Sequence, residues 1–399
     1  MIIFKPPEYI AYILRRLTEN GHDAFLVGGC VRDSIMGRIA HDWDAASSAA
    51  PAEVSRIFQK TALTGEKYGT VTVILPEGTV EVTTFRAESG YKDGRRPGNV
   101  EFVKNLLDDL GRRDFTMNAM AISSAGELTD PFGGFEDIKN RLIRCVGDPD
   151  TRFSEDALRM FRAFRFSAEL GFTIESGTLA SIKKNAERAA FISAERIRAE
   201  LERALLSKRP EAAGDMIETG LLARYTEISD KNPGNLERLA ALPAEAALRW
   251  CAFCAILIDK GFISAPGDFL RAIRLDANTI KTCKSALSID SFPESADDNT
   301  GLKRLLAKHG TAPVRCAAAA RDTLRGGSAL AVTDGIIHSG ECFSLSALAV
   351  SGSDLITLGL PPGREIGHIL AGLLDRVIMR PEDNDRGILM KMIEGPAEK

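Results

Sequence analysis

The stretch FLVGGCVRDSIMGRIAHDWDAASSA, residues 25–49, restricts the fold of this chain more than any other. Its apolar start predicts a buried strand, the glycine pair a tight turn, and CVRDSIMG a short helix. The following HDWDAAS predicts a second strand, on which alternate side chains share one face. Asp42 and Asp44 are therefore expected to point to the same side of a small sheet.

Two carboxylates on one face predict a site for a divalent cation. Side by side they repel, and a cation allows both to stay ionised; Mg²⁺ prefers oxygen ligands and commonly binds one or two carboxylates together with substrate phosphates. We therefore expect Asp42 and Asp44 to be metal ligands. Glu81, in the β-rich run TVEVTTFR, is expected to supply a third acid from a neighbouring strand. Such a set could hold two metals that activate a hydroxyl and neutralise a leaving pyrophosphate.

The glycine turn predicts a phosphate site beside the acids. Backbone N–H groups at Gly28 and Gly29 could surround phosphate oxygens at the positive end of the following helix. Arg32 lies one turn into that helix and could add charge-assisted bonds to a triphosphate. Alone, an acidic pair is usually a solvated turn and a glycine pair a bend. Together within one short unit they favour nucleotidyl transfer.

The chain changes character near residue 150. Before that point, strand-like runs alternate with short helical ones, which predicts an α+β head built on a small sheet. Beyond it, long periodic segments such as SEDALRMFRAFRFSAEL and SAERIRAELERALLSK predict helices, each beginning at a serine with a glutamate in its first turn. The pattern predicts a head at 1–145 followed by an all-α remainder.

Composition and charge exclude several classes of protein. The net charge is −4, so any nucleic-acid surface must be a local basic patch, and residues 141–210 carry more Lys and Arg than Asp and Glu. No run approaches the ~20 apolar residues of a membrane span, and the first twenty residues lack a signal-peptide core. Seven scattered cysteines indicate a reducing cytoplasm. Cys251 and Cys254 form a CxxC without a second pair, which predicts a buried helix.

The segment LVGGCVRDSIMGRIAHDWD resembles the head motif of the class II tRNA nucleotidyltransferases, the CCA-adding enzymes, and of the related bacterial poly(A) polymerases. The resemblance continues in family order through VEVTTFR, RRDFTMNAMA, DPFGGFEDI and RFSEDALRMFRAFRF, and more weakly through SGSDLITLGLPPGREIGHIL near the end. It implies a polymerase β-like head followed by a neck at 146–210, a body at 211–330 and a tail at 331–399. These helical parts are implied to bind the acceptor and T-stem half of tRNA. It implies CTP and ATP as substrates, added as C, C and A to the tRNA 3′ end, and no protein partner.

The helix predicted from SEDALRMFRAFRF could select bases without a template strand. Asp156 and Arg159 are three residues apart and would be neighbours on its surface. A carboxylate only accepts hydrogen bonds and a guanidinium only donates. Cytosine and adenine present an amine donor beside a ring-nitrogen acceptor, whereas uracil and guanine present the reverse. The pair would accept C and A and reject U and G, the role that the family gives to this E-D-x-x-R motif, matched at Glu155, Asp156 and Arg159.

Further site residues follow from the resemblance alone. In RRDFTMNAMA, Arg113 and Asp114 are implied to contact the incoming nucleotide, including its ribose hydroxyl; an ion pair at a helix start is the plain alternative. Arg162 and Arg165 are implied to bind nucleotide through phosphate or the RNA backbone; the alternative is an amphipathic helix with solvated arginines. The family needs a loop at residues 86–103 for the change from C to A addition, and this chain retains it.

Other functions share some of these features. An A-adding enzyme or a poly(A) polymerase carries nearly every motif, although the latter typically has a longer basic extension than the ending MIEGPAEK. Nucleotidyl transfer to a small molecule or protein is disfavoured by the E-D-x-x-R segment and the tail-like run. A non-catalytic RNA-binding protein is disfavoured because an intact acidic pair without metal would repel RNA.

Overall fold

The computed structural model describes residues 6–40, 42–65, 69–89, 99–228, 230–290, 292–293 and 299–394. They form two compact units. The first holds residues 1–204 with 212–224 and 229–232, and the second holds 205–211, 225–228 and 233–399. Within the described ranges, no helix has the length and apolar character needed to cross a membrane. The boundaries expected between head, neck, body and tail remain predictions.

A seven-stranded mixed sheet forms the centre of the head, which confirms the predicted fold class. Its order is β3-β4-β5-β2-β1-β8-β9, and every neighbouring pair is antiparallel except β2 and β5, which are parallel. The strands are β1 (Ala24–Val27), β2 (Asp44–Ser47), β3 (Thr61–Gly65), β4 (Thr70–Leu75), β5 (Gly78–Thr84), β8 (Ala121–Ser123) and β9 (Leu128–Thr129). Two short pairs stand apart, β6 (Arg86–Ser89) with β7 (Asn99–Phe102) and β10 (Leu142–Ile143) with β11 (Thr173–Ile174).

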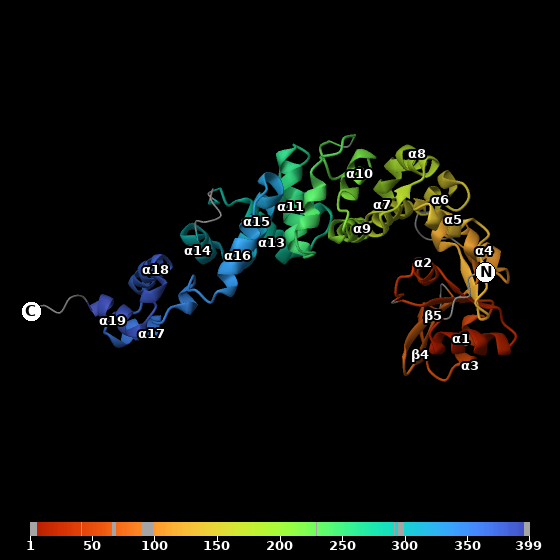
Figure 1. The fold of residues 1–399 in the computed structure, drawn as a ribbon, viewed down its shortest axis with the longest axis horizontal. Coiled ribbons are helices and arrows are strands. Elements are labelled where there is room, and N and C mark those ends of the chain that lie inside the picture. Colours follow the sequence, from red (N-terminus) through yellow and green to blue (C-terminus); the bar gives the residue numbers. More distant parts are fainter. Residues whose placement is uncertain are drawn as a thin grey trace, which may run out of the picture. The chain divides into compact units, whose positions relative to one another are not determined.

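Amphipathic helices cover the sheet. Helix α1 buries Ile10, Ile13, Leu14 and Leu17, one stripe at helical spacing, and packs on α3 beside the sheet (Figure 1). In α3 the Glu53 carboxylate accepts from the Ala50 N–H at 2.7 Å, which fixes the first turn. The helices of the first unit are α1 (Glu8–Glu19), α2 (Gly29–Ile35), α3 (Pro51–Ile57), α4 (Leu106–Gly111), η2 (Thr116–Asn118), α5 (Gly134–Lys139), α6 (Pro149–Glu155), α7 (Leu158–Leu170), α8 (Ser176–Asn185), η3 (Ala186–Phe191), α9 (Ala194–Leu206, which ends just past the unit boundary) and α10 (Ala212–Glu218).

The helix predicted from Ser154 is wrong in one respect, because the chain leaves helical geometry at Asp156. There φ is −140° and ψ is 103°, between the end of α6 and the start of α7. The Asp156 Oδ1 accepts from the Leu158 N–H at 3.1 Å, a local bond by which aspartate competes with helix formation. The cap of α6 is Asp148, whose carboxylate accepts from the Thr151 N–H at 3.0 Å.

The described residues of the second unit from 233 onward form helices joined by turns. Cys251 and Cys254 lie fully buried on α11, as predicted. Helix α11 packs against α13 and α15, and the three lie side by side (Figure 1). The elements are η4 (Leu236–Ala241), α11 (Ala246–Asp259), α12 (Pro266–Ala272), α13 (Ala277–Leu287), α14 (Asn299–His309), α15 (Thr311–Arg325), α16 (Ala329–His338), η5 (Leu345–Ala347), α17 (Gly352–Thr357), α18 (Arg364–Met379), η6 (Pro381–Asp383) and α19 (Arg386–Glu394).

A close backbone contact fixes the turn that carries Asn118. Helix α5 packs on η2 so tightly that a Cβ on Gly134 would lie 2.2 Å from the Thr116 carbonyl oxygen. A backbone oxygen cannot rotate away as a side chain does. Glycine at 134 therefore sets the distance between α5 and η2.

We expect Gly134→Ala to lower the free energy of unfolding by about 1–3 kcal/mol, the usual cost of overpacking. Gly111→Ala is the matched control, because its Cβ would meet the Phe132 ring at an ordinary 3.7 Å. Urea unfolding of the two variants and the parent measures the difference. Equal stability of the Gly134 and Gly111 variants would contradict the packing argument.

Candidate active site

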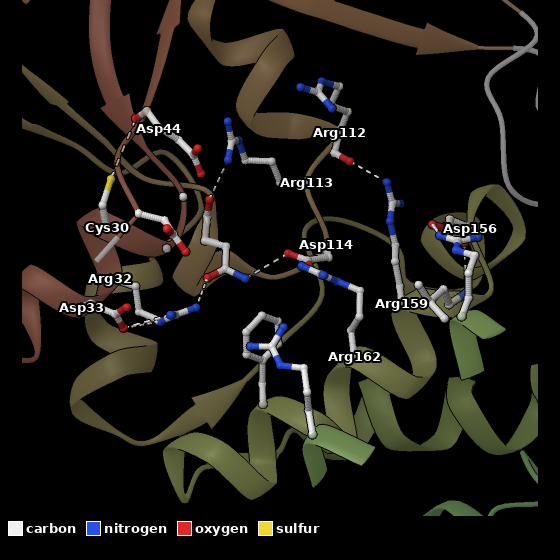
Figure 2. A pocket seen from close by; sticks show the side chains of 18 residues that line it. Cys30, Arg32, Asp33, Asp44, Arg112, Arg113, Asp114, Asp156, Arg159 and Arg162 are labelled. Carbon is white, nitrogen blue, oxygen red and sulfur yellow. Dashed lines mark hydrogen bonds and ion pairs between the residues drawn. The ribbon is translucent and has the colours of Figure 1, made fainter. Parts of the chain in front are cut away.

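One pocket gathers most of the residues that the sequence predicted for the site. Its volume is about 570 Å³, within the range of small-molecule sites, and its walls come from the head and the neck (Figure 2). The predicted residues that line it are Gly29, Arg32, Asp42, Asp44, Arg113, Asp114, Asp156, Arg159 and Arg162. Glu81 and Arg165 are not among the lining residues.

The acidic end of the pocket lies at the start of β2. The predicted strand is shorter than expected: it begins at Asp44, and Asp42 lies in the bend before it, so strand alternation does not explain why both line the pocket. Glu81 is the register partner of Asp44 on the parallel strand β5. Burial, Glu81 and Asp42 raise the pKa of Asp44, against the opposing charge of Arg113. The site therefore holds negative charge that it does not fully compensate.

This donor set fits a divalent cation. It consists of carboxylate oxygens, the ligands that Mg²⁺ prefers, and their mutual repulsion is what a cation relieves. Within the described ranges, no three His, Cys, Asp or Glu side chains are grouped closely enough to hold a metal ion. Glu81 is exposed. Its role as a third ligand thus stays a prediction, as do the metal-binding roles of Asp42 and Asp44.

Gly28 allows an arginine to lie against the turn before α2. Its φ is +77°, and a Cβ there would lie 3.0 Å from the Arg113 Nη1. The Asp109 carboxylate, itself fully buried, accepts from Arg113 Nη2 at 3.1 Å and holds the guanidinium in place. A Cβ on Gly29 would meet only Arg32, at 3.6 Å. Of the two glycines named from the sequence, Gly28 is the one whose conformation requires glycine.

A chain of polar contacts crosses the middle of the pocket (Figure 2). Asp114 accepts from Arg162 Nε at 2.8 Å and from Asn118 Nδ2 at 3.1 Å, and Asn118 Oδ1 accepts from Arg32 Nη1 at 2.8 Å. Burial opposes ionisation of Asp114, but Arg162 and Asn118 outweigh it and lower its pKa to about 2. The sequence analysis missed Asn118; the only available signal was its place in RRDFTMNAMA.

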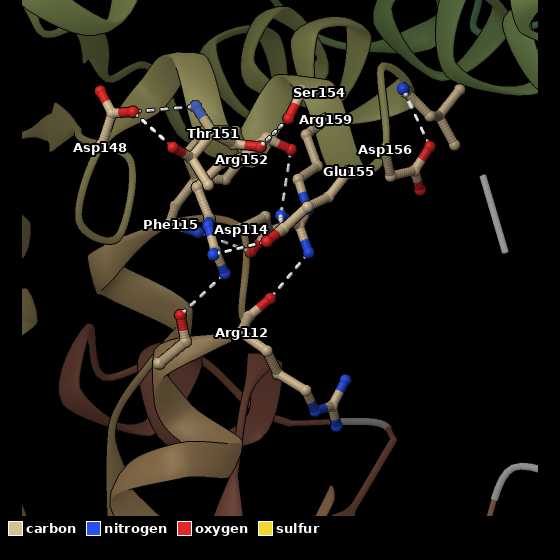
Figure 3. A network of polar contacts seen from close by, with 12 residues as sticks. Arg112, Asp114, Phe115, Asp148, Thr151, Arg152, Ser154, Glu155, Asp156 and Arg159 are labelled. Atoms are coloured by element: carbon tan, nitrogen blue, oxygen red, sulfur yellow. Dashed lines mark hydrogen bonds and ion pairs between the residues drawn. The ribbon is translucent and has the colours of Figure 1, made fainter. Parts of the chain in front are cut away.

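The far end of the pocket contains Asp156 and Arg159. Arg159 Nη2 donates to the Arg112 carbonyl at 2.7 Å, and Nη1 donates to Glu155 Oε2 at 2.6 Å and to the Arg152 carbonyl at 3.1 Å (Figure 3). These bonds fix the guanidinium before any ligand arrives. Asp156 has other partners, the Leu158 N–H and the guanidinium of Arg196.

Phe166 brings three arginines together. The guanidinium carbons of Arg165, Arg32 and Arg162 lie 4.0, 5.2 and 5.2 Å from its ring centroid. Arg165 is buried and paired with Glu200 and Glu169. It contacts the Phe166 ring and is not among the residues that line the pocket. Its predicted contact with nucleotide stays a prediction. Phe166, which the sequence analysis did not single out, also lines the pocket.

The loop expected at residues 86–103 begins and ends as strands. Residues 86–89 pair with 99–102 as β6 and β7. Residues 90–98, the central half of the predicted loop, lie outside the described residues.

Asp44→Asn should raise the thermal midpoint of the metal-free protein at neutral pH, because it removes a charge that burial and two acids disfavour. The pKa of Asp44 is raised in the folded state, so the parent regains that stability when the carboxyl is protonated. The gain should therefore shrink as the pH falls. Thermal unfolding in a chelator from pH 4 to 8 measures it, and a less stable variant at neutral pH would contradict the charge argument.

The chain is similar to known proteins over nearly its whole length. The family model described as the poly A polymerase head domain matches residues 24–144, and one described as the probable RNA and SrmB-binding site of polymerase A matches 171–228. A CCA-adding enzyme of Limosilactobacillus fermentum is 39% identical over 385 residues, covering 95% of this chain and 94% of that protein.

Solved structures are similar over nearly the whole chain. The Bacillus stearothermophilus CCA-adding enzyme in complex with CTP has a TM-score of 0.79 at 33% identity, with 98% of each chain covered. The Thermotoga maritima CCA-adding enzyme complexed with tRNA has a TM-score of 0.66 at 20% identity, covering 98% of this chain and 96% of that one. The second likeness concerns the fold alone.

Proposed function

This chain belongs to the CCA-adding enzymes, and from that membership we propose that it adds C, C and A in turn to the 3′ end of tRNA, using CTP and ATP and releasing pyrophosphate. One observation carries the proposal: a single pocket has an acidic pair at one end and a carboxylate with a fixed guanidinium at the other. The first end suits transfer chemistry and the second suits reading a base. The named relatives are CCA-adding enzymes, one of them solved with CTP, and they support this reaction and its nucleotide substrate.

At the acidic end, Asp42 and Asp44 would hold Mg²⁺, with Glu81 as a third acid. When bound, the metal supplies positive charge that activates the RNA hydroxyl and neutralises the leaving pyrophosphate. Gly29 and Arg32 are proposed to contact the triphosphate. Arg113 lies beside Asp44 and adds a further positive charge there.

At the other end, Asp156 and Arg159 are proposed to select the base. Of the five N–H donors of Arg159, three are bonded among the described contacts, which leaves one on Nη2 and the one on Nε for a ring nitrogen. Asp156 would accept the exocyclic amine of C or A. Each unpaired buried polar group in a mismatch costs about 1–3 kcal/mol, which supports rejection of U and G.

The remaining predicted residues surround the nucleotide between these ends. Arg113, Asp114, Arg162 and Arg165 are proposed to contact it or to support those that do. Asp114 stays ionised and already bonds Arg162 and Asn118, so a ribose hydroxyl would join an existing network. We place the reaction in the cytoplasm, a proposal supported by seven free, buried cysteines.

Three tRNA substrates test the proposal: one lacking CCA, one ending in CC and one complete, each with single nucleotides and with CTP plus ATP. We expect the parent protein to add C, C and A in order, which sequencing of the 3′ ends measures. We expect Asp42→Ala to abolish addition while tRNA binding, measured by a gel-shift assay, persists. An A-adding enzyme would extend only the CC end, and a poly(A) polymerase would add A runs; normal turnover by the variant would refute the metal assignment.

Asp156→Ala should weaken discrimination against UTP and GTP by about tenfold or more, since it removes the acceptor that the amine requires. The measurement is the ratio of kcat/KM for CTP and UTP on a tRNA lacking CCA. Unfolding midpoints of variant and parent control for loss of fold. An unchanged ratio in a folded variant would refute base selection by this carboxylate.

A further inference from the structure

We propose that Arg196 is a positioning residue for base selection: it holds the Asp156 carboxylate so that one remaining acceptor position is left for the amine of C or A. The inference rests on the proposed function of Asp156. Arg196 comes from α9, a helix to which the sequence analysis gave no part in the site. Both side chains line the pocket.

Asp156 needs such a partner because of its place in the chain. It lies in the break between α6 and α7, where the Leu158 N–H holds only one of its two oxygens. Arg196 hydrogen-bonds to both carboxylate oxygens of Asp156: Nη1 donates to Oδ1 at 3.4 Å and Nη2 donates to Oδ2 at 2.9 Å. A guanidinium that spans both oxygens fixes the plane of the carboxylate, which a single bond does not.

The hydrogen bonds of Asp156 occupy most of the acceptor positions of its carboxylate. A carboxylate offers about four acceptor positions, two on each oxygen. Among the described contacts, Oδ1 accepts from the Leu158 N–H and from Arg196, and Oδ2 accepts from Arg196. One position on Oδ2 remains. It suits the single amine hydrogen on the pairing edge of cytosine or adenine, and it repels the carbonyl oxygen that uracil or guanine places there.

The second arginine of α9 at the pocket serves as a comparison. Arg203 lies about two turns further along the helix and donates from Nε to Glu169 Oε1 at 2.9 Å. Its side chain is 58% exposed, against 24% for Arg196. Loss of Arg203 therefore removes a positive charge from the same pocket without releasing Asp156.

The test is a double-mutant cycle on nucleotide selectivity. The variants are Arg196→Ala, Asp156→Ala, both together, and Arg203→Ala, each assayed for kcat and KM with CTP and UTP on a tRNA lacking CCA. We expect Arg196→Ala to lower the CTP-to-UTP preference by about tenfold and to raise the KM for CTP. The double variant should match Asp156→Ala, because Arg196 acts through Asp156. Arg203→Ala should keep the preference, whatever its effect on the rates.

Different outcomes refute different claims. A folded Arg196→Ala variant with parental preference overturns the inference, as does a double variant whose loss is the product of the two single losses. If Arg196→Ala does not fold, Arg196→Gln, which keeps one donor group and cannot span both oxygens, carries the same comparison. Parental preference in Asp156→Ala overturns base selection and this inference together. A parent protein that adds nothing to tRNA overturns the proposed function itself.

Discussion

The ion pair between Asp114 and Arg162 joins the two ends of the pocket. Asp114 precedes η2 in the head, and Arg162 lies on α7 in the neck, so the pair ties two parts of the first unit to one point. A carboxylate this deeply buried is tolerated only with partners, and removal of one partner of a buried pair typically costs about 3–5 kcal/mol. Through Asn118 the same carboxylate orients Arg32. The position of Arg32, proposed to bind phosphate, is therefore not independent of the position of α7, which carries Arg159, proposed to select the base.

Two aspartates in this pocket experience opposite environments. Asp114 has its pKa lowered by Arg162 and Asn118, whereas Asp44 has its pKa raised by burial and by neighbouring acids. The opposed pKa shifts distinguish Asp114, whose charge is balanced by partners within the protein, from Asp44, whose charge is not fully balanced. The difference follows from their partners, since both are aspartates on head elements.

Local patterns predicted the head well because strands, short helices and the glycine turn depend on nearby residues. Strand β5 and the strand–turn–helix around Gly28 lie where the sequence predicted them. The helix break at Asp156 was missed because a side-chain bond to Leu158 outweighed the periodic pattern around it. Asn118 and Arg196 were missed for another reason: their partners lie 86 and 40 residues away in the chain, and spacing carries no information on such contacts.

The break at Asp156 bears on how one cavity can serve two bases of unequal size. Cytosine and adenine both present an amine beside a ring nitrogen, but this edge lies farther from the sugar in the purine. Asp156 keeps one helical bond, from its N–H to the Arg152 carbonyl at 3.3 Å, while its backbone angles are extended. If that bond opened, rotation at this joint would change the depth of the carboxylate without unwinding α6 or α7. Under the proposed function, Asp156 must reach both cytosine and adenine. A carboxylate that can change depth while Arg196 holds its plane would meet that requirement.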